Sequence, residues 1–361
     1  MVRIVVEEDK FLRMLPVIFD PGTPEEHQRA IADFFACDEP DFAGWCRRVR
    51  QQIPGLFPAE IAFARDQADL KDKLGTAAGV VVESLRIGDA ELAAAPQLAV
   101  VQKFGGLVPN IDLEACARHG VAVDMLRRRV NVAVAEQAFA LMIGLVKRLC
   151  ELNGIVYAAA VRKAGFDLAP YDRRYTGNSN FARIPGLRTL RGATLGLIGL
   201  GEIGGELARR ARAFEMDILY FQRHRLSPVE EAGLGARHAS LAELMERSDV
   251  VSIQLPLNES TRGMIDRGLL QRLKPGAIFV DVARAELIER AALYEALDSG
   301  RLGGFGIDVG YEEPARADEK LLAYPNVIYL PHTAVASRQN ALDDVEEMCL
   351  KLWRAITTRQ K

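Results

Sequence analysis

The sequence predicts an α/β protein built from two Rossmann-like, doubly wound parallel-sheet domains. Three observations support this prediction. Short apolar runs of strand length alternate with helical patterns in both halves of the chain. One strand–helix–strand unit, residues 194–225, carries three glycines in G-x-G-x-x-G spacing. The chain has 361 residues, a length at which about two domains are expected.

The composition is that of an ordinary globular enzyme. Apolar residues make up 49% of the chain and charged residues 26%, and the formal net charge is −3. This charge gives no basis for nucleic-acid or membrane binding. The five cysteines are scattered without a C-x-x-C pattern, and the first residues turn acidic at once. We therefore expect reduced thiols, no signal peptide, no metal site and a cytoplasmic location.

The first hundred-odd residues predict a parallel-sheet domain of their own. Thr23 as N-cap, Pro24 and Glu26 predict a helix that continues to about residue 35. The polar stretch 37–45 predicts a loop, and residues 89–94 predict a helix. The predicted strands are residues 2–6, 61–64, 79–82, 98–102 and 121–123.

A domain boundary is expected near Asp124. The apolar helix 130–149 contains several polar residues, which indicates a buried interface helix rather than a membrane span. The poorly periodic segment that follows is long for a connection inside a domain, so residues 130–187 predict a dimerisation helix and arm. Just before them lie Arg127, Arg128 and Arg129. We favour a solvated patch or interface pairs for these arginines over recognition of an extra anionic group on a substrate, for which Lys103 is a further candidate.

Residues 194–225 predict a dinucleotide site. A buried strand, 195–198, precedes Gly199, Gly201 and Gly204, and a helix and the strand 218–221 follow. The first glycine allows a tight turn, the second lets the backbone approach a pyrophosphate, and the third lets helix and strand pack closely. The phosphates then lie at the helix N-terminus. The alternative is a tight turn without a ligand, but the strand–glycine–helix–strand order favours the site.

Capping boxes at Ser227/Glu230 and Ser240/Glu243 predict two further helix starts, and residues 340–356 predict an amphipathic C-terminal helix. Strands are predicted at residues 250–255, 277–282, 304–309 and 327–330.

Charged or titratable residues follow the last three of these strands: Arg284, Glu313 and His332. Arginine binds carboxylates bidentately and polarises a carbonyl. Histidine exchanges protons near neutral pH, and a carboxylate can orient it. Singly, the three indicate a surface group, an acidic turn and a structural histidine. Together, beside a dinucleotide loop, they predict hydride transfer to a keto acid.

From about residue 98 to 336 the chain resembles the D-isomer-specific 2-hydroxyacid dehydrogenases. The resemblance rests on an ordered series of motifs along the chain. Besides the glycine fingerprint these are residues 105–112, Val134-Ala135-Glu136, Leu255-Pro256-Leu257, Thr261-Arg262-Gly263, residues 274–277, Val282-Ala283-Arg284, residues 306–309, Glu313-Pro314, Asn326-Val327 and Pro331-His332.

The resemblance implies roles for individual residues. Arg284 binds and polarises the substrate, Glu313 is the orienting acid, and His332 is the acid/base. Backbone amides around Gly105, Gly106 and Leu107 hold the substrate carboxylate. Asp308 hydrogen-bonds the nicotinamide carboxamide. The implied cofactor-binding residues are Gly199, Gly201, Glu202, Ile203, Gly204, Gln222, Arg223, Leu255, Pro256, Thr261, Val282, Ala283 and Asp308.

The resemblance also implies a homodimer and a discontinuous, flavodoxin-like substrate domain. That domain comprises residues 1–124 with 335–361, and the dinucleotide-binding domain comprises residues 125–334. There are departures from the family pattern. Asp281 stands where asparagine is frequent, Ala285 and Glu286 replace a glycine-rich turn, and Leu107 replaces a frequent glycine. These departures concern details of the substrate pocket.

The end of the second fingerprint strand predicts the cofactor. An NAD-selective site places Asp or Glu about 20 residues after the glycines, to bind the ribose 2′-hydroxyl. Gln222 occupies that place, and Arg223, His224 and Arg225 follow. A 2′-phosphate would meet cations there, so we expect a preference for NADP(H). The alternative is a solvated loop tip and the use of NAD(H).

The predicted function is an NAD(P)-dependent 2-ketoacid reductase acting on a small anionic substrate, such as a glyoxylate or hydroxypyruvate reductase. Formate and phosphite dehydrogenases are the enzymatic alternatives, but no residue supports them. A dinucleotide-sensing corepressor is the alternative from another class. The absence of long low-complexity tails argues against it.

Overall fold

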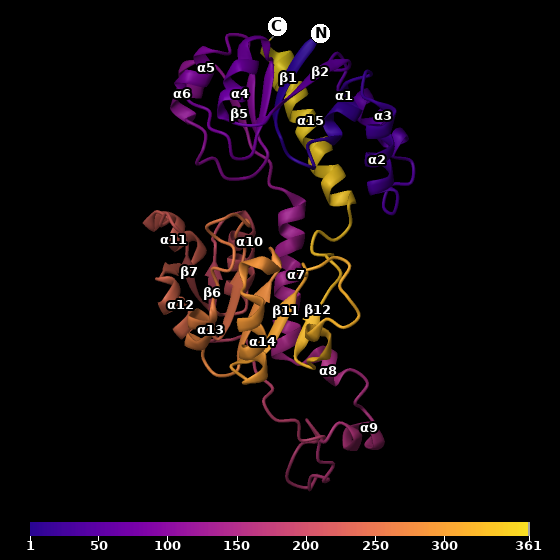
Figure 1. Ribbon diagram of the computed structural model, residues 1–361, viewed down its shortest axis with the longest axis vertical. Coiled ribbons are helices and arrows are strands. Elements are labelled where there is room, and N and C mark those ends of the chain that lie inside the picture. The colour runs from indigo at the N-terminus through magenta and orange to yellow at the C-terminus, as the bar shows by residue number, and fades with distance from the viewer. Residues whose placement is uncertain (360–361) are drawn as a thin grey trace. The chain divides into compact units, whose positions relative to one another are not determined.

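The structure is a computed structural model that describes residues 1–359. The chain divides into two compact units (Figure 1). Unit 1 comprises Met1–Asn131 with Val335–Lys361, and unit 2 comprises Val132–Ala334. Each unit contains one parallel sheet, and the predicted fold class of two parallel-sheet α/β domains is confirmed.

Unit 1 is built on a five-stranded parallel sheet with the order β2-β1-β3-β4-β5. This is the flavodoxin-like order. Strand β2 is added on one side of β1, and β3, β4 and β5 are added on the other side, so the strand order switches between β1 and β3. All residues of β3 and β4 are buried, as expected for a parallel sheet covered on both faces. The strands are β1 (Val2–Glu7), β2 (Ala59–Ala64), β3 (Gly79–Val82), β4 (Val100–Lys103) and β5 (Ala122–Asp124).

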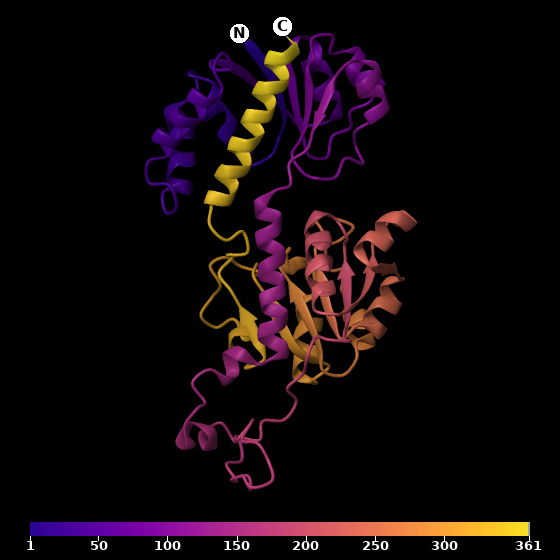
Figure 2. The ribbon, with the colours of Figure 1, turned by 180° about the vertical axis from the view of Figure 1, so that it is seen from behind.

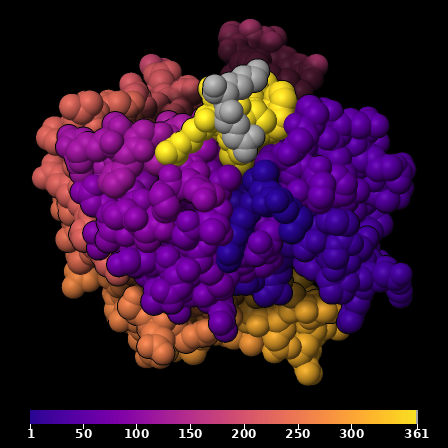
Figure 3. Space-filling view, turned by 90° about the horizontal axis from the view of Figure 1, so that it is seen from above, coloured from indigo at the N-terminus to yellow at the C-terminus, as the bar shows by residue number. Residues whose placement is uncertain are grey.

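The C-terminal helix α15 (Gln339–Arg359) returns the chain to unit 1. Leu352 and Ile356 lie so close to Gly79 that a Cβ there would be 3.4 and 3.3 Å from their side-chain carbons. Figures 2 and 3 show the yellow C-terminal helix beside the indigo N-terminal segment. The other helices of unit 1 are α1 (Met14–Phe19), α2 (Glu25–Phe35), α3 (Phe42–Gln52), α4 (Gln67–Lys73), α5 (Asp89–Ala93) and α6 (Leu113–Arg118).

Unit 2 is built on a seven-stranded parallel sheet with the order β12-β11-β10-β9-β6-β7-β8. The strand order switches between β6 and β9, as in Rossmann folds, because β7 and β8 lie on one side of β6 and the later strands on the other. Ligands of such sheets bind at the carboxyl ends of the strands near this switch point. The strands are β6 (Thr194–Ile198), β7 (Asp217–Phe221), β8 (Ala236–His238), β9 (Val250–Ile253), β10 (Ala277–Asp281), β11 (Leu302–Ile307) and β12 (Val327–Tyr329).

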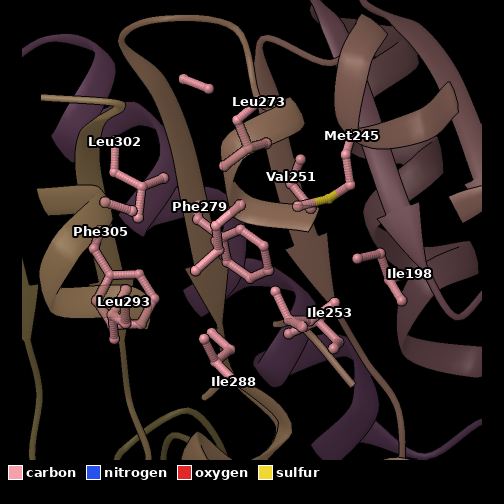
Figure 4. Close-up of a cluster of buried hydrophobic side chains, with 14 of the residues drawn as sticks. Ile198, Met245, Val251, Ile253, Leu273, Phe279, Ile288, Leu293, Leu302 and Phe305 are labelled. Carbon is pink, nitrogen blue, oxygen red and sulfur yellow. The ribbon is translucent and has the colours of Figure 1, made fainter. Parts of the chain in front are cut away.

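The core of unit 2 lies between this sheet and its helices. Val251, Phe279 and Phe305 come from three adjacent strands and are wholly buried (Figure 4). The helices are α7 (Arg129–Val146), α8 (Leu149–Leu152), α9 (Ala158–Lys163), α10 (Glu202–Ala213), α11 (Pro228–Leu234), α12 (Leu241–Arg247), α13 (Arg267–Arg272) and α14 (Arg290–Asp298).

Helix α7 packs on the sheet of unit 2. A Cβ on Gly306 of β11 would lie only 3.1 Å from the Cβ of Leu141, so the bare glycine lets helix and strand approach closely. The helix is long and apolar enough to cross a membrane, but 67% of it is buried inside the protein, as expected for a core helix. Beyond α9, the residues up to β6 form no regular helix or strand, and Figures 1 and 2 show them as an arm that leaves the body of unit 2.

Two local predictions for unit 1 were wrong. The helix near residue 23 begins at Glu25 without a side-chain cap. The Thr23 hydroxyl instead donates hydrogen bonds of 2.8 Å to the carbonyls of Pro16 and Asp20. The expected loop 37–45 contains the start of α3, where the Asp41 carboxylate accepts a hydrogen bond from the amide of Gly44. The acidic residues of this stretch favoured a loop, but α3 has a buried apolar face formed by Phe42, Trp45, Cys46 and Val49.

Candidate active site

The glycine loop of unit 2 connects β6 to α10. Gly199 has φ +96°, and a Cβ there would lie 2.9 Å from the carbonyl oxygen of Gln254. A Cβ on Gly204 would lie 2.5 Å from the carbonyl oxygen of Gly199. Gly201 faces open space, and no side chain caps α10, which begins at Glu202. An open glycine cradle at an uncapped helix N-terminus fits the pyrophosphate of a dinucleotide.

Gln222 lies at the end of β7, beside this loop. Its Oε1 accepts a hydrogen bond of 3.3 Å from the amide of Leu200, and its Nε2 donates one of 2.6 Å to the carbonyl of His224. The side chain therefore ties the glycine loop to the turn after β7. Ile203, named with the glycines from the sequence, follows Glu202 in the first turn of α10 and is half-buried.

The two arginines after Gln222 differ in their availability. Arg225 forms a two-point ion pair with Glu231, at 2.8 and 2.9 Å. That pair, helped by the Tyr220 hydroxyl, lowers the pKa of Glu231 to about 2. Arg223 is exposed and its side chain forms no ion pair or hydrogen bond within residues 1–359. Arg223 is thus the cation that remains available to a ligand.

The loop after β9 lies next to the glycine loop, because β9 is the neighbour of β6 at the point where the strand order switches. Leu255 packs against Gly199, where a Cβ would lie 2.9 Å from Leu255 Cδ2. The Thr261 hydroxyl donates a 2.8 Å hydrogen bond to the carbonyl of Pro256 and closes the loop. These residues, picked from the sequence as cofactor contacts, lie where Rossmann sheets bind their ligands.

His332 and Glu313 come together after two neighbouring strands. His332 Nδ1 lies 2.9 Å from Glu313 Oε2, and the amide of Gly310 donates a 3.2 Å hydrogen bond to Glu313 Oε1. Both side chains are more than two-fifths exposed, at 44% and 42%. With Nδ1–H donating to the carboxylate, the other ring nitrogen of His332 is left for proton exchange, and it makes no hydrogen bond within the described residues.

Asp308 fixes the backbone of His332. The His332 amide donates a 2.8 Å hydrogen bond to the carbonyl of Asp308. The Asp308 carboxylate accepts from the amides of Thr333 and Ala334, at 2.9 and 2.8 Å. His332 has φ +55°, a left-handed conformation that costs about 1 kcal/mol in a non-glycine residue. Asp308 is wholly buried, so it holds this turn in addition to the cofactor contact expected from the sequence.

Arg284 follows β10, the strand next to β11. Its side chain is exposed, with Nη1 donating a 2.6 Å hydrogen bond to the carbonyl of Ala283. Its amide and that of Ala283 both donate to one oxygen of Asp281, at 3.1 and 2.8 Å. Val282 is buried and Ala283 half-buried. The three residues that the sequence singled out for chemistry thus follow three adjacent strands at one edge of the sheet.

A network that the sequence did not reveal anchors the loop carrying Glu313. The Arg290 guanidinium donates to the Tyr294 hydroxyl and pairs with Glu319, and Tyr294 donates a 2.7 Å hydrogen bond to Glu319. The Tyr311 hydroxyl donates to the carbonyl of Ile288. Because these residues lie on α14 and on the loop after β11, far apart in sequence, no local motif could indicate them.

The glycine pair of unit 1 follows β4 at its carboxyl end. The amide of Leu126 donates a 2.8 Å hydrogen bond to the carbonyl of Gly105. A Cβ on Gly106 would lie 3.9 Å from the Cα of Arg127. Residues 126–127 therefore support the loop, and Leu107 is about half exposed.

The basic residues near this loop already have partners. Arg129 pairs with Asp344 and Glu347, at 3.0 and 2.9 Å. The Arg128 guanidinium lies 4.1 Å from the centre of the Phe104 ring, and Lys103 donates to the carbonyl of Glu83. These contacts favour a structural role. Within residues 1–359, no cluster of three or more His, Cys, Asp or Glu side chains is placed to hold a metal ion.

Comparison with known proteins identifies the family. The model of the D-isomer-specific 2-hydroxyacid dehydrogenase NAD-binding domain matches residues 158–334. The glyoxylate reductase of Korarchaeum cryptofilum is 32% identical over 305 residues, covering 81% of this chain and 86% of that protein. The chain belongs to the D-isomer-specific 2-hydroxyacid dehydrogenase family.

Further relatives of this dehydrogenase agree with the assignment. The 4-methyl-2-oxopentanoate reductase A of Aspergillus oryzae is 36% identical over 275 residues, covering 76% of this chain and 77% of that protein. The solved structure of the TT0316 protein from Thermus thermophilus is 28% identical, with a TM-score of 0.51 and coverage of 96% and 94%. The protein is therefore an NAD(P)-dependent 2-hydroxyacid dehydrogenase with a nicotinamide dinucleotide cofactor.

Proposed function

We propose that this dehydrogenase is an NADP(H)-preferring 2-ketoacid reductase whose chemistry is carried by Arg284, Glu313 and His332. The observation that carries the proposal is the 2.9 Å contact between His332 Nδ1 and Glu313, one strand away from an exposed arginine. No other histidine of unit 2 follows a strand beside a carboxylate and an arginine in this arrangement.

Each side chain has one task. The guanidinium of Arg284 binds the substrate carboxylate and polarises the keto oxygen, because its charge and fork geometry suit both. The free ring nitrogen of His332 gives its proton to the oxygen as the hydroxyl forms. Glu313 holds the imidazole in the required tautomer and stabilises its protonated form. The bound dinucleotide supplies the hydride from its nicotinamide ring.

The loops position the two ligands. The open cradle at Gly201 and the N-terminus of α10 hold the pyrophosphate. Backbone amides of residues 105–107 hold the substrate carboxylate. The reducing direction consumes the proton on the free ring nitrogen of His332, and the oxidising direction returns a proton to the same nitrogen.

The NADP(H) preference rests on Arg223 and Gln222. Arg223 is exposed and without an ion-pair partner in the described chain, and Gln222 brings no negative charge that would repel a 2′-phosphate. Arg225 is committed to Glu231, so Arg223 carries most of the expected effect. A carboxylate at position 222 would accept from a ribose 2′-hydroxyl instead and would repel the phosphate.

Steady-state kinetics with a panel of 2-ketoacids tests the proposal. Glyoxylate, hydroxypyruvate and 4-methyl-2-oxopentanoate are assayed with NADPH and with NADH. We expect turnover of at least one ketoacid and a higher kcat/KM with NADPH, and Gln222→Asp should shift the preference toward NADH by roughly tenfold, about 1.4 kcal/mol. A higher kcat/KM with NADH in the wild type would disprove the cofactor preference. Failure to turn over any ketoacid would disprove the reaction.

The arm supports a homodimer. Val156, Tyr157 and Tyr175 are large side chains that the arm exposes, and such surfaces are usually covered by a partner. We therefore propose that the arm packs on a second copy of the chain. The cysteines of residues 1–359 form no disulfide, which is consistent with a cytoplasmic protein. Light scattering of the purified enzyme tests the dimer, and a monomer at micromolar concentration would contradict it.

A further inference from the structure

Asp281 ends β10, directly under the turn that carries Arg284. It is wholly buried, with 0% exposure. One carboxyl oxygen, Oδ1, accepts the amides of Ala283 and Arg284, at 2.8 and 3.1 Å. The other oxygen, Oδ2, is buried and has no hydrogen-bond partner among residues 1–359. One half of this carboxyl therefore fixes the backbone of Arg284, while the other half is unsatisfied.

The unsatisfied oxygen decides which protonation state the fold prefers. A buried ionised carboxylate with an unpaired oxygen loses its hydration without compensation, and that loss is much larger for a charged group than for a neutral one. Burial accordingly raises the pKa of Asp281 to about 7, with the amides of Ala283 and Arg284 and the charge of Arg284 opposing the rise.

The groups that face Asp281 do not supply a strong counter-charge. Glu286, in the short turn after Arg284, adds a like charge. Tyr311, from the loop after β11, is a neutral phenol that already donates its hydroxyl to Ile288. The neighbouring Asp308 gives Asp281 only a backbone contact, because its amide donates to the Asp281 carbonyl and its carboxylate binds the amides of residues 333 and 334. Among the groups that act most strongly on Asp281, Arg284 is the cation.

We propose that Asp281 is a positioning residue for Arg284 that works in its protonated, neutral form, and that ionisation of its buried carboxyl lowers turnover in both reaction directions. The proposal rests on the role of Arg284 in the proposed function. A neutral carboxyl orients the turn 282–284 through Oδ1 and leaves the full positive charge of Arg284 for the substrate. An ionised carboxyl beneath the same turn offsets that charge and draws water or a donor toward Oδ2.

This behaviour differs in sign from that of His332. Loss of the His332 proton slows reduction but favours oxidation. Loss of the Asp281 proton slows both. Ionisation of Asp281 should therefore be visible as an alkaline fall of hydroxyacid oxidation, the direction that loss of the His332 proton does not slow.

Asp281→Asn tests this directly. The asparagine keeps the oxygen that accepts the two amides but cannot ionise. We expect kcat/KM at the optimum to stay within about threefold, a change of less than 1 kcal/mol, and the alkaline fall in oxidation to disappear. Asp281→Ala removes the acceptor and should lower kcat at every pH. Asp217→Asn, an exposed aspartate at the start of β7, should leave both pH profiles unchanged.

A second readout does not depend on turnover. Because the folded chain holds a proton on Asp281 that the unfolded chain releases above about pH 4, the wild type should lose stability as pH rises from about 4 to 7. Asp281→Asn lacks this loss, so the difference between the two denaturation midpoints should change with pH in favour of the variant. A constant difference, or an alkaline fall in oxidation that persists in Asp281→Asn, would overturn the inference. If His332→Ala kept normal ketoacid turnover, the proposed function would fail instead, and the stability readout would still decide the state of Asp281.

Discussion

The carboxyl edges of the two sheets use buried acidic side chains in opposite ways. Glu7, at the end of β1 in unit 1, accepts hydrogen bonds from the amides of Glu83, Ser84 and Leu85, at 2.6, 2.8 and 2.9 Å, and from the Ser84 hydroxyl. Asp281, at the end of β10 in unit 2, receives two amides on one oxygen, and no donor of the described chain reaches the other. Glu7 is saturated with donors, whereas Asp281 is half-satisfied.

The side chains around the two carboxylates follow the same division. In unit 1, Lys103 and Arg129 bind to carbonyls and carboxylates of their own unit, and the edge offers a ligand mainly backbone groups. In unit 2, Arg284 and His332 are exposed and keep donors for a ligand. Where the polar groups at a sheet edge are fully hydrogen-bonded, they fix the neighbouring loop. Where some lack partners, the edge is less stable but its polar groups can bind a ligand.

The largest expected effect is on the reactive edge. His332→Ala should lower kcat for ketoacid reduction by about 10²–10⁴, because proton transfer in the transition state contributes that much. The unfolding midpoint should hardly change, since the side chain is 44% exposed. Glu313→Gln should give a smaller loss of kcat, because an amide still positions the imidazole but stabilises its charge less.

The control for this pair is His119→Ala, which removes an exposed histidine beside Asp89 at the end of α6. It should leave kcat for the ketoacid unchanged. If the rates and pH profiles of His332→Ala matched those of the wild type, the edge of unit 2 would not be the reactive one. The two edges would then differ in hydrogen bonding but not in function.

The next largest effect is on the satisfied edge, and it is an effect on stability. Glu7→Ala leaves three amides of residues 83–85 without their acceptor. We expect a loss of about 2–4 kcal/mol in the free energy of unfolding, since each unsatisfied buried donor costs roughly 1–3 kcal/mol and water replaces part of the loss. Chemical denaturation of the variant measures it.

Glu8→Ala is the matched control, because Glu8 is exposed and pairs with Arg13. It should cost less than about 1 kcal/mol. If Glu7→Ala were as stable as Glu8→Ala, the saturated carboxylate would contribute nothing to the fold, and the contrast with Asp281 would reduce to a difference in geometry.

The sequence predicted the elements whose signals are local. Strand β3 and helix α5 appear within one residue of the expected limits, and the box at Ser227 closes as expected, with the Glu230 amide bound to the Ser227 hydroxyl and the Glu230 carboxylate bound to the Ser227 amide. At Ser240 only half of the predicted box forms: the Ser240 hydroxyl accepts a hydrogen bond from the Glu243 amide, but the Glu243 carboxylate pairs with Arg247. Arg284, Glu313 and His332 could be picked as candidates because strand ends of a parallel sheet meet at one edge.

The missed features depend on partners that are distant in sequence. Glu7 binds amides 76 to 78 residues away, and Thr23 turns inward to the end of α1 instead of capping α2. The unsatisfied oxygen of Asp281 is visible only once its surroundings are folded. Local patterns carry no information on such contacts, because the fold decides which polar groups meet.

The smallest expected effect concerns the arginines beside the substrate loop of unit 1. Arg129→Ala removes an ion pair to the buried Asp344, although Asp344 keeps a hydrogen bond of 2.9 Å from the amide of Arg129. Arg128→Ala removes the contact with Phe104, worth roughly 0.5–1 kcal/mol. Both changes should lower stability slightly. If these side chains serve the fold, the ratio of kcat/KM for 2-oxoglutarate to that for pyruvate should change by less than about threefold, or 0.7 kcal/mol. A tenfold fall of that ratio in Arg128→Ala would instead make this arginine a recognition group for a second carboxylate, and the edge of unit 1 would then contribute side chains, as well as backbone, to substrate binding.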